Sequence, residues 1–159
     1  MASRGSGPLR AYRIADARLP IFDGTGAARE GGRWNSPERS VIYAATTYAG
    51  ALLETLAHAN IGVIPKNQAY VETRIPAEVE IEQITAPEIP DGEAPDQEAS
   101  RSYGDRWHDE RRTAVLLVPS VVTWIEHSVV INAEHPAGGV IRVSAPQPVM
   151  WDQRLFRSA

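Results

Sequence analysis

An unbroken apolar run from Ala114 to Val118 limits the folds open to this chain more than any other segment does. A run of this length that ends at Pro119 predicts a buried strand near the centre of a sheet. Other strand-like segments lie before and after it, together with two helical patterns at irregular spacing. This mixture favours an α+β fold over a parallel array of β–α–β units.

Two segments predict helices, one over about residues 48–59 and one over about residues 102–112. In the first, Leu52 and Leu56 recur at helical spacing and belong to an apolar stripe. The second opens with a capping-box pattern whose first residue is Ser102. Strands are expected at about residues 9–14, 41–44, 69–75, 79–84, 129–131 and 139–143.

Two further stretches are expected to lack regular structure. The glycine-rich stretch at 23–32 contains Gly24 and Gly26, but Arg29 stands where a dinucleotide-binding fingerprint needs its third glycine. We therefore expect a turn there, with no helix. The stretch at 85–98 combines prolines with acidic residues and contains no basic residue, which predicts a solvated loop.

Length and composition narrow the class of protein. With 159 residues the chain fits one domain, for which we expect a flexible lead-in at 1–8 and a single domain at 9–159. The absence of cysteine excludes a disulfide scaffold, a thiolate zinc site and a cysteine nucleophile. The net charge of −4 argues against direct binding of nucleic acid, and no apolar run is long enough to cross a membrane. We expect a cytoplasmic protein.

Four residues are candidates for a functional site, and each has an ordinary structural alternative. Arg33 follows two glycines and can reach a phosphate with its planar fork, or it can form a salt bridge on a surface turn. Glu54 faces away from the apolar stripe, so it is either a solvated residue or a catalytic carboxylate beside a cleft. By themselves, Tyr43 is expected to be a core tyrosine and Ser120 a turn residue at the end of a strand.

These four residues belong to an ordered set of short motifs that covers about residues 10–156. The set comprises Asp23-Gly24-x-Gly26-Ala27, Gly31–Pro37, Val41–Tyr43, Ala51–His58, Gly104-Asp105-x-Trp107, Leu117–Ser120, Ile131-Asn132, His135-Pro136 and Asp152-x-Arg154-Leu155-Phe156. With these motifs in this order, the chain resembles the RES family, the toxins of RES–Xre type II toxin–antitoxin pairs. Departures from the family's pattern are Glu38 and Arg39 after Pro37, and the residues that flank His135 and Pro136.

The resemblance implies a fold similar to that of ADP-ribosyltransferases, with a mixed or antiparallel split sheet, flanking helices and NAD in a cleft between the sheet halves. It implies that Arg33, Tyr43 and Glu54 are catalytic and that Arg33, Tyr43 and Ser120 bind NAD. It also implies an Xre-type antitoxin as the partner, through which the pair would contact DNA. NAD would be a substrate, with no permanently bound cofactor and no metal.

The chemistry of NAD fits this small set of residues. Nicotinamide is cationic in NAD and leaves as a neutral base, so the acid that glycosidases use to protonate a leaving oxygen is not needed. Glu54 can stabilise the positive charge that develops on the ribose, while Arg33 binds a phosphate and Tyr43 stacks on the pyridinium. We expect a toxin that depletes NAD by hydrolysis or phosphorolysis. The alternatives are ADP-ribosylation of a host protein and a catalytically silent module that binds a partner.

Overall fold

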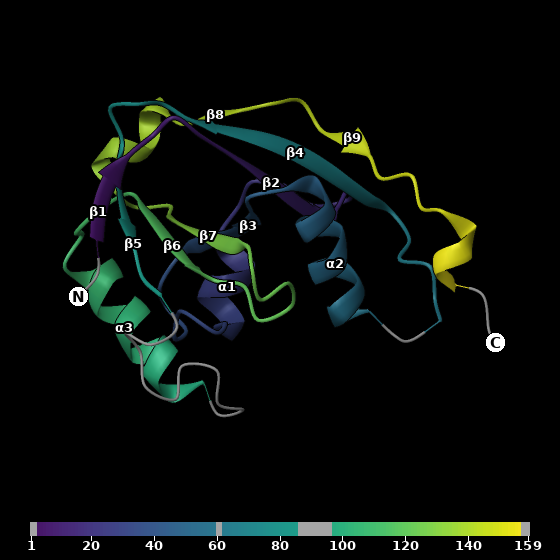
Figure 1. Cartoon of the computed structure of the whole chain (residues 1–159), viewed down its shortest axis with the longest axis horizontal. Coiled ribbons are helices and arrows are strands. Elements are labelled where there is room, and N and C mark those ends of the chain that lie inside the picture. Colours follow the sequence, from purple (N-terminus) through teal and green to yellow (C-terminus); the bar gives the residue numbers. More distant parts are fainter. Residues whose placement is uncertain (1–2, 60–61, 86–96, 157–159) are drawn as a thin grey trace.

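The computed structural model describes residues 3–59, 62–85 and 97–156, and in these residues a nine-stranded sheet is accompanied by three α-helices (Figure 1). The strands are β1 (Ser3–Ser6), β2 (Leu9–Asp16), β3 (Val41–Ala45), β4 (Gln68–Ile75), β5 (Glu80–Gln83), β6 (Val115–Pro119), β7 (His127–Asn132), β8 (Arg142–Val143) and β9 (Gln147–Pro148). The helices are α1 (Thr25–Glu30), α2 (Tyr48–His58) and α3 (Glu98–Asp109), with short 3-10 helices η2 (Pro136–Val140) and η3 (Gln153–Phe156). Within the described ranges, no helix has the length and apolar character needed to cross a membrane.

The sheet is mixed and divides into two parts. Its strand order is β1-β5-β6-β7-β3-β2-β4-β8, with β9 also paired to β4, and β5 and β6 run parallel. Strands β2 and β4 pair over their whole length, whereas β2 and β3 share a single pair, Tyr12 with Ala45. The two parts therefore meet at a narrow junction. The predicted α+β class, with a split mixed sheet and flanking helices, is confirmed.

The apolar run that predicted a central strand forms β6, which is hydrogen-bonded to β5 on one side and to β7 on the other. Val115 packs with Ile131 on one face of the sheet. Leu116 and Val118 pack on the other face, against Trp107 of α3. Because these side chains are at most 2% exposed, each aliphatic one contributes roughly 1.5–3 kcal/mol to the stability of the fold.

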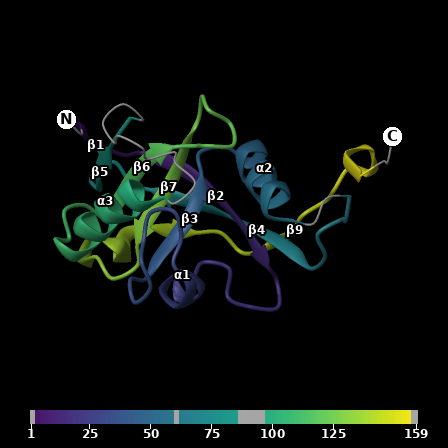
Figure 2. The ribbon, with the colours of Figure 1, turned by 90° about the horizontal axis from the view of Figure 1, so that it is seen from below.

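The three α-helices lie on the same side of the sheet, as the two views of the ribbon show (Figures 1 and 2). Helix α3 lies beside β5 and β6, whereas α1 and α2 lie nearer β3 and β2. The hydroxyl of Thr47 caps α2 by accepting a hydrogen bond from the N–H of Gly50 (2.9 Å). The side of the sheet that carries these helices also carries the loops between α1 and β3 and between β6 and β7.

Two helix expectations are wrong. The glycine-rich stretch contains α1 instead of a turn, because the side-chain amide of Asn35 donates a hydrogen bond to the carbonyl of Ala27 (2.9 Å) and fixes the segment from outside. Helix α3 begins at Glu98 and not near Ser102, so the capping-box pattern lies inside the helix. Packing of the buried Ser100, before that pattern, extends the helix toward its N-terminus.

Two other segments also differ from expectation. The lead-in at 1–8, expected to be flexible, contains β1, which pairs antiparallel with β5 and covers its outer edge. The strand expected at 139–143 is divided between η2 and β8, because the consecutive glycines Gly138 and Gly139 lie in the 3-10 turn. The predicted acidic loop lies mostly at 86–96, outside the described residues.

Candidate active site

The loop that follows α1 carries Arg33 and is closed on itself. Gly32 and Asn35 form an isolated β-bridge, in which the N–H of Gly32 lies 2.9 Å from the carbonyl oxygen of Asn35. The side-chain amide of Asn35, which is fully buried, donates hydrogen bonds to the carbonyls of Ala27 (2.9 Å) and Arg39 (3.2 Å). These contacts tie both ends of the loop together, so the backbone at Arg33 is held in one position.

Tyr43 of β3 holds the same loop through its hydroxyl group. The hydroxyl donates a hydrogen bond to Oδ1 of Asn35 (2.6 Å) and accepts one from the N–H of Trp34 (3.0 Å). A Cβ at Gly32 would lie 2.7 Å from this hydroxyl, so Tyr43 can come this close to the loop only because residue 32 is glycine. Burial raises the pKa of Tyr43, and the hydrogen bond from Trp34 opposes only part of that rise. At neutral pH the phenol is therefore a protonated link in the loop, and only its half-buried ring remains for contact with a ligand.

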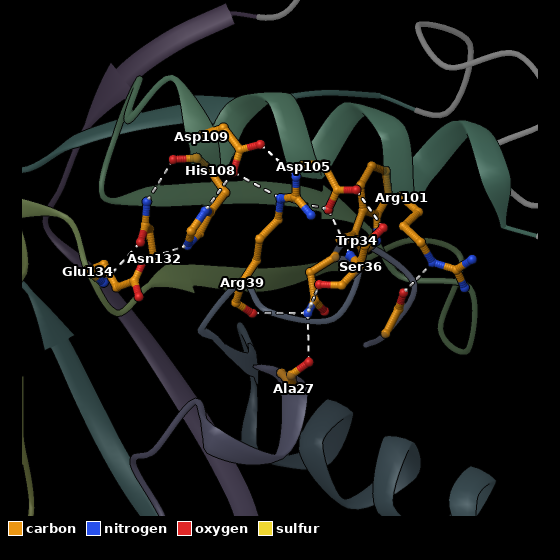
Figure 3. A network of polar contacts seen from close by, with 12 residues as sticks. Ala27, Trp34, Ser36, Arg39, Arg101, Asp105, His108, Asp109, Asn132 and Glu134 are labelled. Carbon is orange, nitrogen blue, oxygen red and sulfur yellow. Dashed lines mark hydrogen bonds and ion pairs between the residues drawn. The ribbon is translucent and has the colours of Figure 1, made fainter. Parts of the chain in front are cut away.

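Helix α3 clamps the Arg33 loop from the opposite side (Figure 3). The carboxylate of Asp105 accepts hydrogen bonds from the N–H (2.7 Å) and the hydroxyl (2.6 Å) of Ser36. Gly104 allows this approach, because a Cβ there would lie 1.8 Å from the carbonyl oxygen of Trp34. The Gly104-Asp105 pair in the motif set is thus explained by its contact with the loop.

Glu54 and Ser120 meet at the end of β6, although 66 positions separate them in the sequence. The hydroxyl of Ser120 lies 3.4 Å from Oε1 of Glu54, and it also accepts hydrogen bonds from two N–H groups of the following turn. Ser120 is 5% exposed and Glu54 is half-buried, so α2 directs this carboxylate toward the turn. A second contact, from the hydroxyl of Thr47 to Glu126 (2.8 Å), fixes the start of α2 to the same turn.

The structure thus arranges the four predicted residues as two pairs. Arg33 and Tyr43 meet at the loop beside α3, where the positive charge of Arg33 is among the influences that lower the pKa of Tyr43. Glu54 and Ser120 form the second pair. Tyr43 packs against the core beneath α3, and Glu54 lies on α2, so both pairs are on the helical side of the sheet.

The sequence pattern indicated no site role for Asn35 or Asp105, although both lie within the motif set, and Asp105 was expected only as part of a capping box. Their contacts join segments that are far apart in the chain, such as the 69 positions between Ser36 and Asp105. The Gly104-Asp105 motif was the available signal, because a glycine inside a helix lowers helix stability and so points to a packing or functional reason.

Histidine side chains have structural contacts. The buried His108 lies 3.3 Å from Asp109 through Nδ1 and 3.3 Å from Glu134 through Nε2 (Figure 3). His135 accepts a hydrogen bond from the N–H of Ala137 (3.0 Å). Among the residues that the structure describes, no group of three or more His, Asp or Glu side chains is placed to hold a metal ion.

A groove of about 460 Å³ lies elsewhere, between β4 and the segment that contains β8 and β9. Its lining includes Tyr70, Glu72, Arg74 and Arg142, and none of the four predicted residues. Within it, Glu72 is paired with Arg74 (2.8 Å). We place the candidate site at the two pairs described above, because the four residues that the sequence selected are found there.

Comparison with known proteins shows which proteins this chain resembles. The profile of the RES domain matches residues 10–152. A protein from Sphingobium sp. (strain YBL2), named Prs ADP-ribosylating toxin, is 39% identical over 156 residues, which cover 93% of this chain and 97% of the relative. A protein from Pseudomonas putida, named Toxin Res, is 31% identical over 137 residues, which cover 85% of this chain and 92% of the relative.

A solved structure shares the fold. It is the crystal structure of the M. tuberculosis MbcT–MbcA toxin–antitoxin complex. One chain of that complex aligns with this chain with a TM-score of 0.74. The alignment covers 96% of this chain and 89% of that chain at 19% sequence identity, so the likeness concerns the fold alone. The profile match and the two relatives identify the family: this chain belongs to the RES domain family.

Proposed function

We propose that this RES protein is the toxin of a toxin–antitoxin pair and that it cleaves the bond between nicotinamide and ribose in NAD. The names of its relatives support the first part, since one is an ADP-ribosylating toxin and another is called Toxin Res. Transfer of ADP-ribose from NAD requires cleavage of this bond. The observation that carries the proposal is the contact between Ser120 and Glu54, which holds a half-buried carboxylate at the end of β6.

The proposed chemistry needs a single carboxylate. The bond between C1′ of the ribose and the pyridinium nitrogen breaks, and its electron pair stays on the nitrogen, which gives neutral nicotinamide. Positive charge then develops on the ribose ring, and a fixed carboxylate at Glu54 would stabilise it more strongly than mobile water does. Ser120 holds Oε1 of Glu54 in orientation. An acceptor oxygen then forms the new bond to C1′ and releases its proton.

Arg33 and Tyr43 would bind the remainder of the substrate. The guanidinium of Arg33 offers a bidentate fork for a phosphate of NAD, which is a geometry that lysine lacks. The ring of Tyr43 would face the cationic pyridinium, an attraction worth about 0.5–2 kcal/mol. Its hydroxyl takes part only through the loop, because Asn35 and Trp34 already occupy it.

The acceptor separates two enzymatic alternatives. Water would give ADP-ribose, and inorganic phosphate would give its phosphate ester; both depletion reactions fit a toxin. Transfer to a protein side chain is the second candidate, and it is favoured by the name of the relative that is 39% identical. A catalytically silent binding module fits less well, because such a module would have no need to keep Glu54 and Ser120 in contact.

We further propose an Xre-type antitoxin as the partner, with any contact to DNA made through the antitoxin. The resemblance to RES–Xre pairs suggests this partner, and the protein with the same fold was solved in a toxin–antitoxin complex. A toxin that consumes NAD would act in the cytoplasm, where NAD is available. NAD is its substrate here, with no resident cofactor.

The direct test incubates the purified protein with NAD in three conditions: buffer alone, buffer with phosphate, and buffer with bacterial extract. Mass spectrometry of small molecules and of proteins then identifies the product. We expect loss of NAD and release of nicotinamide in at least one condition, with the product naming the acceptor. Unchanged NAD in all three conditions, with folded protein, would contradict the proposal.

A further inference from the structure

Arg101 of α3 lies beside the loop that carries Arg33, and the proposed NAD chemistry has given it no role. It is one helical turn before Asp105, on the face of α3 that clamps the loop (Figure 3). Its Nε donates a hydrogen bond to the carbonyl oxygen of Gly32 (3.2 Å). Because Gly32 directly precedes Arg33, this bond fixes the Arg101 guanidinium next to the Arg33 backbone.

The rest of the Arg101 guanidinium is turned away from the contact between loop and helix. Figure 3 shows its two terminal nitrogens on the side opposite Asp105 and Arg39. Arg39 is paired with Asp109 (2.7 Å) and Arg112 with Glu82 (3.0 Å). Arg101, by contrast, forms no ion pair with any carboxylate in the described part of the chain. A half-buried guanidinium held by its Nε, with its terminal nitrogens turned outward, is suited to an anionic ligand.

We propose that Arg101 and Arg33 together bind the diphosphate of NAD, with one guanidinium for each phosphate group. The inference rests on the proposed function for the identity of the ligand, and it adds a second cation to the site. Each phosphate of NAD carries one negative charge, and an arginine fork binds two phosphate oxygens with charge-assisted hydrogen bonds. The protein has a net charge of −4, so a diphosphate must be held by placed cations and not by the overall field.

The electrostatics of Tyr43 support this placement. Burial raises the pKa of Tyr43, and the positive charges of Arg101 and Arg33 both oppose that rise. The two guanidinium groups are thus within electrostatic reach of one phenol, which itself is bonded to Asn35 and Trp34 of the loop. This common neighbour is consistent with the two arginines facing one ligand.

The test measures binding of ADP by calorimetry, because ADP carries a diphosphate but lacks the bond that the enzyme cleaves. Arg101→Gln is compared with Arg106→Gln, which removes a positive charge from an exposed position of the same helix. Loss of charge-assisted hydrogen bonds predicts that Arg101→Gln weakens ADP binding roughly ten- to hundred-fold. Arg106→Gln should change it by less than about two-fold, since exposed charges are screened. AMP, with a single phosphate, should lose less affinity than ADP in the Arg101 variant.

Several results would overturn the inference: equal ADP affinity in wild type and Arg101→Gln, an equal loss in Arg106→Gln, or no ADP binding by the wild type. If Arg101→Gln fails to fold, Arg101→Lys is the second variant, because it keeps the charge but not the fork. It should still bind ADP about ten-fold more weakly than wild type, and full affinity would contradict the inference.

NAD turnover in the same samples separates this inference from the proposed function. A folded Arg101→Gln should raise KM for NAD more than it lowers kcat, because the diphosphate lies away from the bond that breaks. If the wild type binds ADP through Arg101 but leaves NAD intact, the diphosphate site is supported and the proposed reaction is contradicted. If the wild type and Arg101→Gln consume NAD with the same KM, the proposed reaction is supported and the diphosphate site at Arg101 is contradicted.

Discussion

At the scale of single residues, Glu54→Gln separates charge from shape. Glutamine keeps an oxygen that accepts the hydrogen bond from Ser120, which lies 3.4 Å from Oε1 in the wild type. It loses the negative charge, whose stabilising effect is greatest when the ribose becomes cationic. Turnover of NAD should therefore fall roughly 10²–10³-fold, the usual effect of removing one preorganised electrostatic group. The free energy of unfolding should change by less than about 1 kcal/mol.

Steady-state kinetics and thermal unfolding test this prediction together. The matched control is Glu30→Gln, which removes an exposed carboxylate at the end of α1. The control should leave both measurements unchanged. A folded Glu54 variant with normal turnover would make Glu54 a structural partner of Ser120, and the reaction would need another carboxylate.

Tyr43→Phe tests the hydroxyl that joins β3 to the Arg33 loop. The substitution keeps the ring but leaves the N–H of Trp34 and Oδ1 of Asn35 without this partner, which should destabilise the fold by about 1–3 kcal/mol. The difference should depend on pH. Burial raises the pKa of Tyr43 in the folded state, whereas an unfolded tyrosine loses its proton near pH ~10. The wild type therefore loses stability as the pH rises above about 10, and Tyr43→Phe lacks this contribution.

Denaturant unfolding at about pH 8 and about pH 10.5 measures the effect, because the second value lies above the ordinary tyrosine pKa. The stability advantage of the wild type over Tyr43→Phe should be present at the lower pH and smaller at the higher one. The same difference at both values would mean that the phenol ionises equally in the folded and unfolded protein.

The sequence was enough to choose candidate site residues, but it did not show their contacts. Ordered motifs identified Arg33, Tyr43, Glu54 and Ser120 as one set. Taken alone, each had an ordinary alternative, and the alternative for Ser120, a turn residue at the end of a strand, is confirmed. Its hydroxyl binds the following turn and also contacts Glu54. A helical wheel placed Glu54 opposite the apolar stripe and could not show that the turn after β6 covers it.

At the scale of elements, Gly104→Ala tests the clamp between α3 and the Arg33 loop. The new Cβ would lie 1.8 Å from the carbonyl oxygen of Trp34, which is a backbone atom that cannot rotate away. The helix and the loop must separate, which should cost at least about 1–3 kcal/mol of stability. The hydrogen bonds from Ser36 to Asp105 would lengthen with that movement, so NAD turnover should fall as well.

Gly26→Ala is the matched control, because nothing lies within 4 Å of a Cβ at this position of α1. It should leave turnover unchanged and can add up to about 1 kcal/mol of stability, since alanine favours a helix. Chemical denaturation and NAD turnover compare the two variants. A Gly104 variant as stable and active as the control would show that α3 is not needed to hold the loop.

Helix α2, which has a clear apolar stripe, was predicted better than the six-residue helix α1. The apolar stripe of α2 indicated a helix over about residues 48–59, and the helix spans Tyr48–His58. Helix α1 has only six residues and is held by distant contacts, such as the bond from the amide of Asn35 to the carbonyl of Ala27. No local pattern reports such a contact, which explains why a turn was expected there.

At the scale of the whole molecule, the class of fold followed from local patterns, whereas the order of the strands did not. The apolar run of β6 required neighbours on both sides, and the structure supplies β5 and β7. The junction between β2 and β3 depends on one pair, Tyr12 with Ala45, and the edge of β5 is covered by β1 (Ser3–Ser6). These pairings join segments far apart in the chain, and strand propensity alone does not select among them.

Expression of this protein without an antitoxin should arrest bacterial growth, because loss of NAD removes a substrate of many reactions. The exposed apolar residues Leu53, Trp124 and Ile125 (44%, 70% and 89% exposed) lie close in sequence to Glu54 and Ser120. Exposed apolar side chains are a common feature of surfaces that bind a protein partner. An antitoxin bound there would cover the Glu54–Ser120 pair and stop the reaction.

Induced expression of the wild type and of Glu54→Gln, each with and without the protein encoded beside it, tests this order of events. The wild type should arrest growth, and co-expression of the neighbour should restore it. Glu54→Gln should permit growth in both cases and still co-purify with the neighbour, because the substitution keeps the shape of the surface and removes one charge. Arrest that persists with Glu54→Gln would mean that toxicity does not depend on this carboxylate. If the wild type alone permits normal growth and no neighbour co-purifies with it, the toxin assignment is contradicted. The reaction with NAD is then tested only by the assay with purified protein.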